Sequence, residues 1–191
     1  HSIGTIRNLS YIDLNTNKFN GRIPDSIKQL SNLTYLNLGN NKLTGPISSV
    51  LCELSTLTQL KLDTNQFSGT ISGCLGQITN LQALLLNFNQ LNGTIPSFLG
   101  NLTPLQVLNL GHNHLIGVIP SSFSELHALK TLDLSVNTLT GTIPEYITTF
   151  TQLETLDIEE NLMYGTLPAA LGNLTIFKEF YGNNNFFTGT I

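Results

Sequence analysis

The stretch that decides the fold is LQALLLNFNQLNGTIPSFLGNLTP, residues 81–104. This unit recurs with a period of 24 residues and with no insertion or deletion along the 191 residues. Its Asn occurs at Asn17, Asn41, Asn65, Asn89, Asn113, Asn137, Asn161 and Asn185. Its Gly occurs at Gly21, Gly45, Gly69, Gly93, Gly117, Gly141, Gly165 and Gly189. Eight copies of one structural unit therefore make up the chain.

The first half of each unit predicts a short strand. Leu84 and Leu86 are two residues apart, and the same spacing of apolar residues returns in the other copies. Successive side chains of a strand point to opposite faces, so a spacing of two places both leucines on one face. We therefore expect short strands that turn alternate side chains inward.

The second half of each unit predicts another short strand and a helical segment. Ile95 is followed by Pro96, which cannot donate to a central ladder, so an edge-like strand is expected to end there. Leu99 and Leu102 are three residues apart and share one face of a helical or 3₁₀ segment.

These units are expected to stack, because a single repeat cannot bury its apolar side alone. Stacking would pair equivalent strands in a parallel sheet at a spacing of about 4.8 Å. An Asn amide offers two donors and an acceptor, so the Asn column is predicted to satisfy backbone groups of the turns inside the coil. The Gly column marks a turn or a close backbone approach and not a phosphate loop.

The unit at 81–104 is similar to the plant-type leucine-rich repeat, whose signature is an LxxLxL strand, an Asn and LxGxIP. The resemblance covers the whole chain. It implies an α/β solenoid, a right-handed leucine-rich-repeat superhelix of eight 24-residue coils. A parallel concave sheet, a short second sheet and 3₁₀ or helical convex segments are expected. Ser48 and Ser72 depart from the signature by replacing Pro, and Gly182 replaces a core Leu in the eighth repeat.

The resemblance also sets expectations for function. Members of this family are extracellular recognition modules of receptor kinases and receptor-like proteins, inhibitors of cell-wall polygalacturonases, and some ice-binding proteins. They usually carry Cys-bearing caps, whereas Cys52 and Cys74 lie inside convex segments. We therefore expect a single domain over residues 1–191, uncapped at both ends. The two cysteines are 22 residues apart, which is nearly one coil. The sequence is therefore compatible with a disulfide and with two free thiols.

Several classes of function are disfavoured. The formal net charge is −4 and the basic residues are scattered singly, which argues against nucleic acid as a partner. No apolar run reaches the roughly 18 residues of a membrane span. Nucleophile-elbow, P-loop and dinucleotide patterns are absent, which predicts a non-enzyme without a cofactor. His112 and His114 have no evident third ligand and are interpreted as surface imidazoles, so no metal site is expected.

Five sequons indicate N-linked glycans on a secreted or cell-surface protein. They begin at Asn8, Asn32, Asn92, Asn101 and Asn173, outside the strict Asn column. All five are expected on loops or outer strands.

The outward positions of the concave strands predict a binding site for a peptide or protein. We call the expected apolar cluster the concave patch; it comprises Leu85, Phe88, Val107, His112 and Val136. Its predicted charged border, the acidic rim, comprises Asp133, Asp157 and Glu159, with Glu160 beside them. Exposed apolar clusters with a charged border often mark protein contacts. Small residues merely tolerated on a concave sheet are the alternative.

Two further hypotheses concern other surfaces. Residues 1–61 carry six Lys or Arg against three Asp or Glu, and residues 131–191 carry one against seven. Open sheet ends of opposite charge would favour head-to-tail association of copies into a filament. Pairs such as Thr140 and Thr142 on the outer strand resemble an ice-binding face, but Arg22, Pro46, Ile116, Val118 and Tyr164 interrupt the array.

Overall fold

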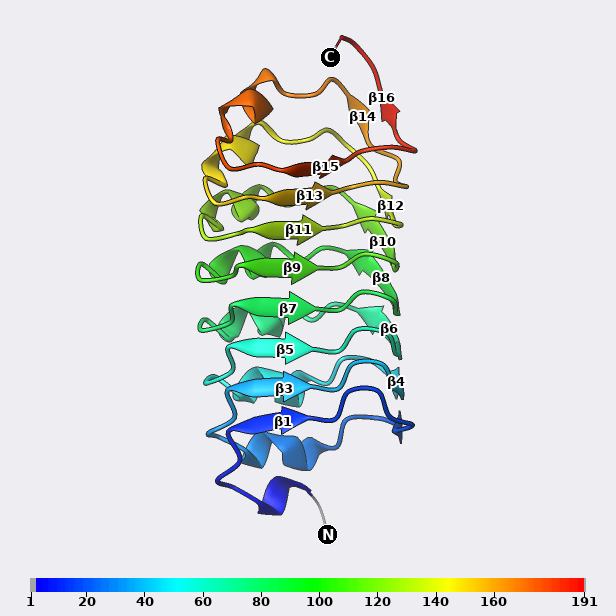
Figure 1. The fold of residues 1–191 in the computed structure, drawn as a ribbon. Helices are drawn as coiled ribbons and strands as arrows, with labels where there is room; N and C mark the ends of the chain where they lie inside the picture. Colours follow the sequence, from blue (N-terminus) through cyan, green and yellow to red (C-terminus); the bar gives the residue numbers. More distant parts are fainter. Residues whose placement is uncertain (1–2, 191) are drawn as a thin grey trace.

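The computed structural model describes residues 3–190 as one stack of coils, and its main feature is an eight-stranded parallel sheet (Figure 1). Its strands are β1 (Tyr11–Asp13), β3 (Tyr35–Asn37), β5 (Gln59–Lys61), β7 (Ala83–Leu85), β9 (Val107–Asn109), β11 (Thr131–Asp133), β13 (Thr155–Asp157) and β15 (Glu179–Tyr181). They follow one another across the sheet in sequence order. Equivalent positions pair, as Leu84 does with Leu108, so the 24-residue period directly sets the register.

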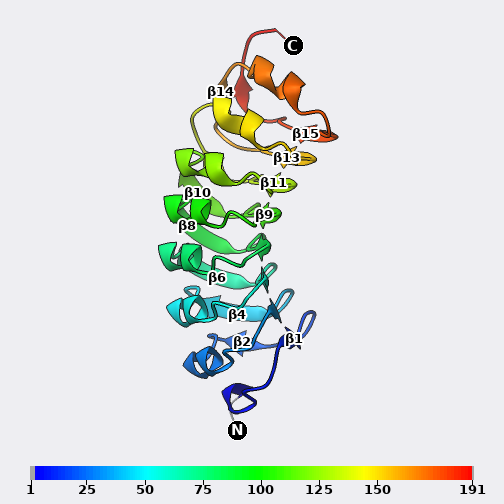
Figure 2. The same ribbon diagram turned by 90° about the vertical axis from the view of Figure 1, so that its left-hand side faces the viewer.

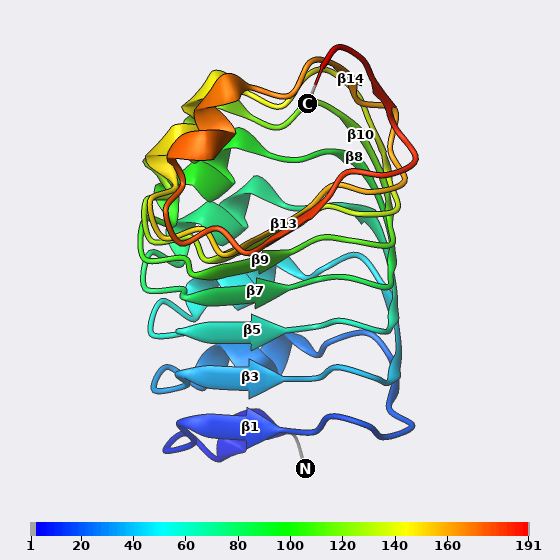
Figure 3. The same cartoon turned by 45° about the horizontal axis from the view of Figure 1, so that its top comes forward.

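A second set of short parallel strands forms an adjoining side of the coils (Figure 3). Six of them make one sheet: β2 (Asn20–Gly21), β4 (Lys42–Gly45), β6 (Gln66–Thr70), β8 (Gln90–Thr94), β10 (His114–Gly117) and β12 (Thr138–Leu139). The pair β14 (Tyr164–Gly165) and β16 (Phe186–Phe187) is separate. The glycine of each unit has a positive φ, 84° at Gly117, which L side chains disfavour. This backbone requirement explains the Gly column.

The convex segments are 3₁₀ helices, which line the side of the stack away from the main sheet (Figure 2). They are η1 (Ile3–Thr5), η2 (Asp25–Gln29), η3 (Ser49–Glu53), η4 (Gly73–Gln77), η5 (Ser97–Asn101), η6 (Ser121–Glu125), η7 (Glu145–Thr149) and η8 (Ala169–Asn173). The Pro that follows the recurring Ile of the unit occupies the cap of the next 3₁₀ helix, as Pro96 does before η5 with a φ of −73°. The Pro ring fixes φ near this value, which suits the residue that precedes a helix.

The core consists of the leucine columns stacked coil upon coil. Leu84, Leu99 and Leu108 are completely buried, as are the rings of Phe67 and Phe123. The inward positions predicted by the spacing of two are those that the structure buries. The predicted leucine-rich-repeat solenoid is confirmed.

The Asn column joins neighbouring coils by side-chain hydrogen bonds. The amide of Asn113 donates to the carbonyls of Leu110 and Gly111 in its own coil and of Leu86 in the preceding coil. Its Oδ1 accepts the N–H of Leu91, which also belongs to the preceding coil. Equivalent bonds surround Asn89, Asn137 and Asn161. The column is therefore a structural ladder, as predicted.

The structure joins Cys52 on η3 to Cys74 on η4 by a disulfide, with 5.8 Å between the Cα atoms. Of the two states that the sequence left open, the structure therefore has the bridged one. The bond ties the third and fourth convex segments, and disulfides of this kind persist in oxidising compartments.

Candidate binding site on the concave face

The solvent-facing side of the main sheet is the expected concave face. Most strands leave their first and third residues accessible and bury the second, as in β7, where Leu84 is buried between half-exposed Ala83 and Leu85. The exceptions are buried Asn37 on β3 and half-buried Phe180 on β15. Hydrogen bonds to both neighbouring strands fix these positions. A ligand here would meet side chains on a rigid, preformed surface.

Leu85 and Val107 lie in one shallow hollow of about 350 Å³ on this face. Gln59, Lys61, Gln82, Ala83 and Gln106 complete its lining. The two apolar side chains come from adjacent strands, because β7 pairs with β9. The amide groups and the Lys61 ammonium surround them with hydrogen-bonding groups, so the hollow combines an apolar floor with a polar border.

Phe88 and His112 form the other half of the concave patch. Their rings stack with centroids 3.9 Å apart and planes 13° from parallel. Both residues directly precede a ladder Asn and have positive φ values, 53° and 52°, as does Val136 at 50°. This left-handed bend lies just after β7, β9 and β11 and leaves Phe88 exposed and His112 half-exposed.

The concave patch contains two groups of side chains. Leu85 and Val107 line the hollow, whereas the stacked rings of Phe88 and His112 are not part of its lining. Asn87 and buried Gly111 stand between these positions along the chain. The Oδ1 of Asn87 is buried and accepts no hydrogen bond.

Two carboxylates of the acidic rim belong to adjacent strands of the main sheet. Asp133 and Asp157 face each other in register on β11 and β13. Each Oδ1 also accepts the backbone N–H two residues later, from Ser135 and Glu159 respectively. Asn37 and Asn109 make the same bond in their coils. The aspartates therefore also have a structural role at the strand end, which sequence reasoning missed. The recurrence of Asp and Asn at this position of the repeat is the signal that could have revealed it.

The Asp157 carboxyl has a strongly perturbed pKa. Burial is the largest cause that raises the pKa of Asp157, to about 6, and the neighbouring Asp133 and Glu159 carboxylates contribute to the same shift. The N–H of Glu159 and the imidazole of His112 oppose this shift. The carboxylates thus repel one another on this face at neutral pH.

Replacing Asp157 with Asn is expected to stabilise the fold above pH 6. Because the pKa of this carboxyl is raised in the folded protein, the free energy of unfolding of the wild-type chain falls as the pH rises from about 4 to 6. The advantage of the variant is therefore absent below pH 4. Solvent screening limits the gain at pH 7 to about 1 kcal/mol. Denaturant unfolding of both proteins at pH 4 and pH 7 measures it. A gain of equal size at both pH values would contradict the repulsion.

A polar cluster that sequence reasoning missed lies at the other end of the concave face. The Tyr11 and Tyr35 rings stack with centroids 4.2 Å apart. The Lys61 ammonium lies 5.1 Å from the Tyr35 centroid and 3.4 Å from its hydroxyl. Asn37 donates to both Tyr35 and Asp13. The period of 24 puts the two tyrosines in one column and is the signal that could have found them.

The sequon asparagines are all exposed. Asn8 and Asn32 lie in turns and Asn92 on β8, as expected. Asn101 and Asn173 instead end the 3₁₀ helices η5 and η8, because each unit continues its convex segment to that residue.

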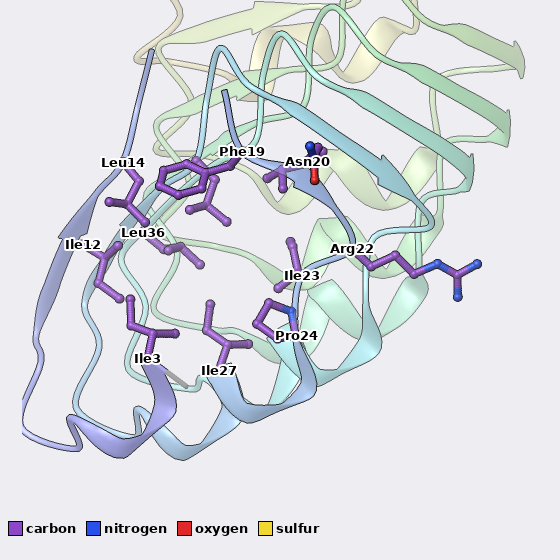
Figure 4. Close-up of a pocket in the computed structure, with 12 residues that line it drawn as sticks. Ile3, Ile12, Leu14, Phe19, Asn20, Arg22, Ile23, Pro24, Ile27 and Leu36 are labelled. Carbon is purple, nitrogen blue, oxygen red and sulfur yellow. The ribbon is translucent and has the colours of Figure 1, made fainter. Parts of the chain in front are cut away.

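Two further surface regions lie at the first coil and on the second sheet. A hollow at the first coil is lined by core-column residues such as Ile12, Ile23 and Ile27, and Arg22 points away from it (Figure 4). Its apolar lining continues the core. On the second sheet, exposed Ile116 and Tyr164 interrupt the threonine columns.

Within residues 3–190, no helix has the length and apolar character needed to cross a bilayer. The same residues contain no group of three or more His, Cys, Asp or Glu arranged to hold a metal ion.

Comparison with known proteins places the chain in a family. A family model described as Leucine rich repeat matches residues 7–67 and 79–139, and the chain belongs to this family. No curated protein matches the sequence significantly.

Solved structures of plant receptors share the fold. The chain is similar to the Arabidopsis receptor kinase HAESA ectodomain in complex with an IDA peptide hormone, at 41% identity and a TM-score of 0.93, over 98% of this chain and 32% of that chain. It is similar to the plant peptide hormone receptor RGFR1 in complex with RGF2, at 34% identity and a TM-score of 0.90, over 99% and 34%. The chain therefore spans about a third of these relatives' length. A plant ice-binding protein is similar at 28% identity and a TM-score of 0.78, over 99% and 68%.

Proposed function

We propose that this chain is a non-enzymatic, extracellular recognition module that binds a peptide or protein segment on its concave face, over β7 to β13. The observation that carries this proposal is the hollow in which Leu85 and Val107 lie half-exposed between polar groups. Solved relatives hold peptide hormones, which supports a ligand of this kind. The disulfide and the exposed sequons support an extracellular setting.

The rigidity of the sheet favours binding. Leu85 and Val107 are held by strands paired on both sides, so a ligand orders few protein side chains on binding. A preorganised surface loses less entropy, which raises affinity for a given contact area. The stacked rings of Phe88 and His112 offer a second rigid contact.

Changing both Leu85 and Val107 to Glu is expected to abolish binding of peptides selected on the wild-type chain. The probe is a displayed library of random 12-residue peptides, and affinities of selected peptides are measured by fluorescence anisotropy. Two carboxylates in the hollow would remove its apolar floor and weaken binding by about a hundredfold or more.

The matched control is the double change of Ile116, on β10 of the second sheet, and Val118, just after this strand, to Glu. These side chains are 50% and 57% exposed, so their replacement tests for general effects of added charge. Retained affinity in the Leu85 and Val107 variant, with loss in the control, would move the site to the second sheet. Sedimentation of the wild-type chain at low salt tests the rival hypothesis of end-to-end association, which requires growth in mass.

A further inference from the structure

We infer that the segment bound on the concave face is basic and apolar: it places an apolar side chain in the Leu85 and Val107 hollow and a Lys or Arg, preferably Arg, on the acidic rim. This inference rests on the proposed function and adds the chemistry of the ligand. Two features of one rigid face carry it, the exposed apolar hollow and the neighbouring carboxylates.

In the part of the chain that the structure describes, no Lys or Arg forms an ion pair with the carboxylates of the acidic rim. Within the described residues the ion pairs are Lys28 with Glu53 and Lys178 with Glu154, and neither involves the rim. The outward residues of β11 and β13 are threonine and aspartate. A cation from a ligand would therefore relieve existing repulsion between Asp133 and Asp157, and charge complementarity of this kind selects a basic partner.

The distance between the hollow and the acidic rim also restricts the sequence of the ligand. The hollow lies between β7 and β9 and the rim between β11 and β13, two strands along the sheet. Strands lie about 4.8 Å apart, so the separation is roughly 10 Å, which an extended chain spans with about three residues. We therefore expect the apolar and basic residues about two to four positions apart.

Arg suits the rim better than Lys. Asp133 and Asp157 occupy equivalent positions of adjacent strands, and each keeps one oxygen free of the backbone hydrogen bond that its Oδ1 accepts. A planar guanidinium presents several donors in a fixed fork and can bond two carboxylates together.

The pH dependence follows from the groups around Asp157. Asp133 on β11, Glu159 after β13 and His112 after β9 act on its charge, and Tyr181 on β15 is its partner in register. The pKa of Asp157 is raised to about 6, so the carboxylate is lost on going from pH 7 to pH 5. Affinity for a basic probe should fall over this range, and most of the fall should disappear when Asp157 is replaced with Asn.

Three displayed libraries of 12-residue peptides test the inference, with charged residues restricted to Lys and Arg, to Asp and Glu, or absent. We expect enrichment on the wild-type chain from the basic library, with an apolar residue two to four positions from Arg. The combined changes Asp133→Asn and Asp157→Asn should weaken these peptides about tenfold or more. Asn preserves the backbone bond, as Asn109 shows in the same column.

The control combines Asp13→Asn with Asp25→Asn, which changes the net charge equally in the first coils and should alter affinity less than about twofold. Binding that is lost with Leu85→Glu and Val107→Glu but unchanged by the two rim substitutions would overturn the inference and leave the proposed function standing. Equal enrichment from the neutral or acidic library would do the same. Peptides insensitive to both variants, or no enrichment from any library, would overturn both proposals.

Discussion

Replacing Asn113 with Ala is expected to lower the free energy of unfolding by about 3 to 5 kcal/mol. The side chain is 6% exposed, and its loss leaves the N–H of Leu91 without its acceptor. The carbonyls of Leu86 and Leu110 each lose one of two amide donors and keep the other, from Asn89 and Asn137 respectively. A buried donor left unsatisfied costs about 1 to 3 kcal/mol, and each further hydrogen bond lost costs about 0.5 to 1.5 kcal/mol. Denaturant titration followed by circular dichroism measures the change.

Asn17→Ala is the matched control, since Asn17 belongs to the same column in the first coil. Asn17 is exposed and donates only to carbonyls of its own coil, those of Leu14 and Asn15. Water can replace these bonds, so we expect a loss below about 1 kcal/mol. Similar losses in the two variants would show that the links between coils contribute nothing beyond the local turn.

Leu108→Ala is the second large effect, with an expected loss of about 2 to 5 kcal/mol through cavity formation. Leu108 is completely buried, and Leu84 and Leu132 lie beside it in register. Leu85→Ala in the neighbouring strand should cost less than about 1 kcal/mol, because its side chain is on the solvent face. Equal losses at Leu85 and Leu108 would contradict the register of the sheet.

The 24-residue period is the reason why much of the fold could be predicted from the sequence. Strict columns fix which residues of successive coils pair, so the register of Leu84 with Leu108 and the burial of Asn113 follow from the sequence. The ends of the segments are less determined. The break between the six-stranded and two-stranded parts of the second sheet has no marker in the repeat.

The candidate site was predicted in composition but not in detail. Spacing placed Leu85 and Val107 outward, yet it could not show that they line a hollow without Phe88 and His112, whose rings stack on each other. Both rings follow the left-handed bend before a ladder Asn, which residue types such as Phe and Val do not signal.

The cysteine pair illustrates a different limit. A separation of 22 residues placed Cys52 and Cys74 on adjacent coils, but bonding depends on the approach of their backbones. The structure supplies that distance, 5.8 Å between Cα atoms, which lies in the range that a disulfide spans.

Methyl NMR during titration with a selected peptide tests the central claim, recognition on the concave face, most directly. The Leu85 and Val107 methyl groups should show saturable shifts, and those of Ile116 and Val118 on β10 and just after it provide internal references in the same sample. We predict shifts at Leu85 and Val107 with the second sheet unchanged. Shifts confined to Ile116 and Val118 would contradict the account.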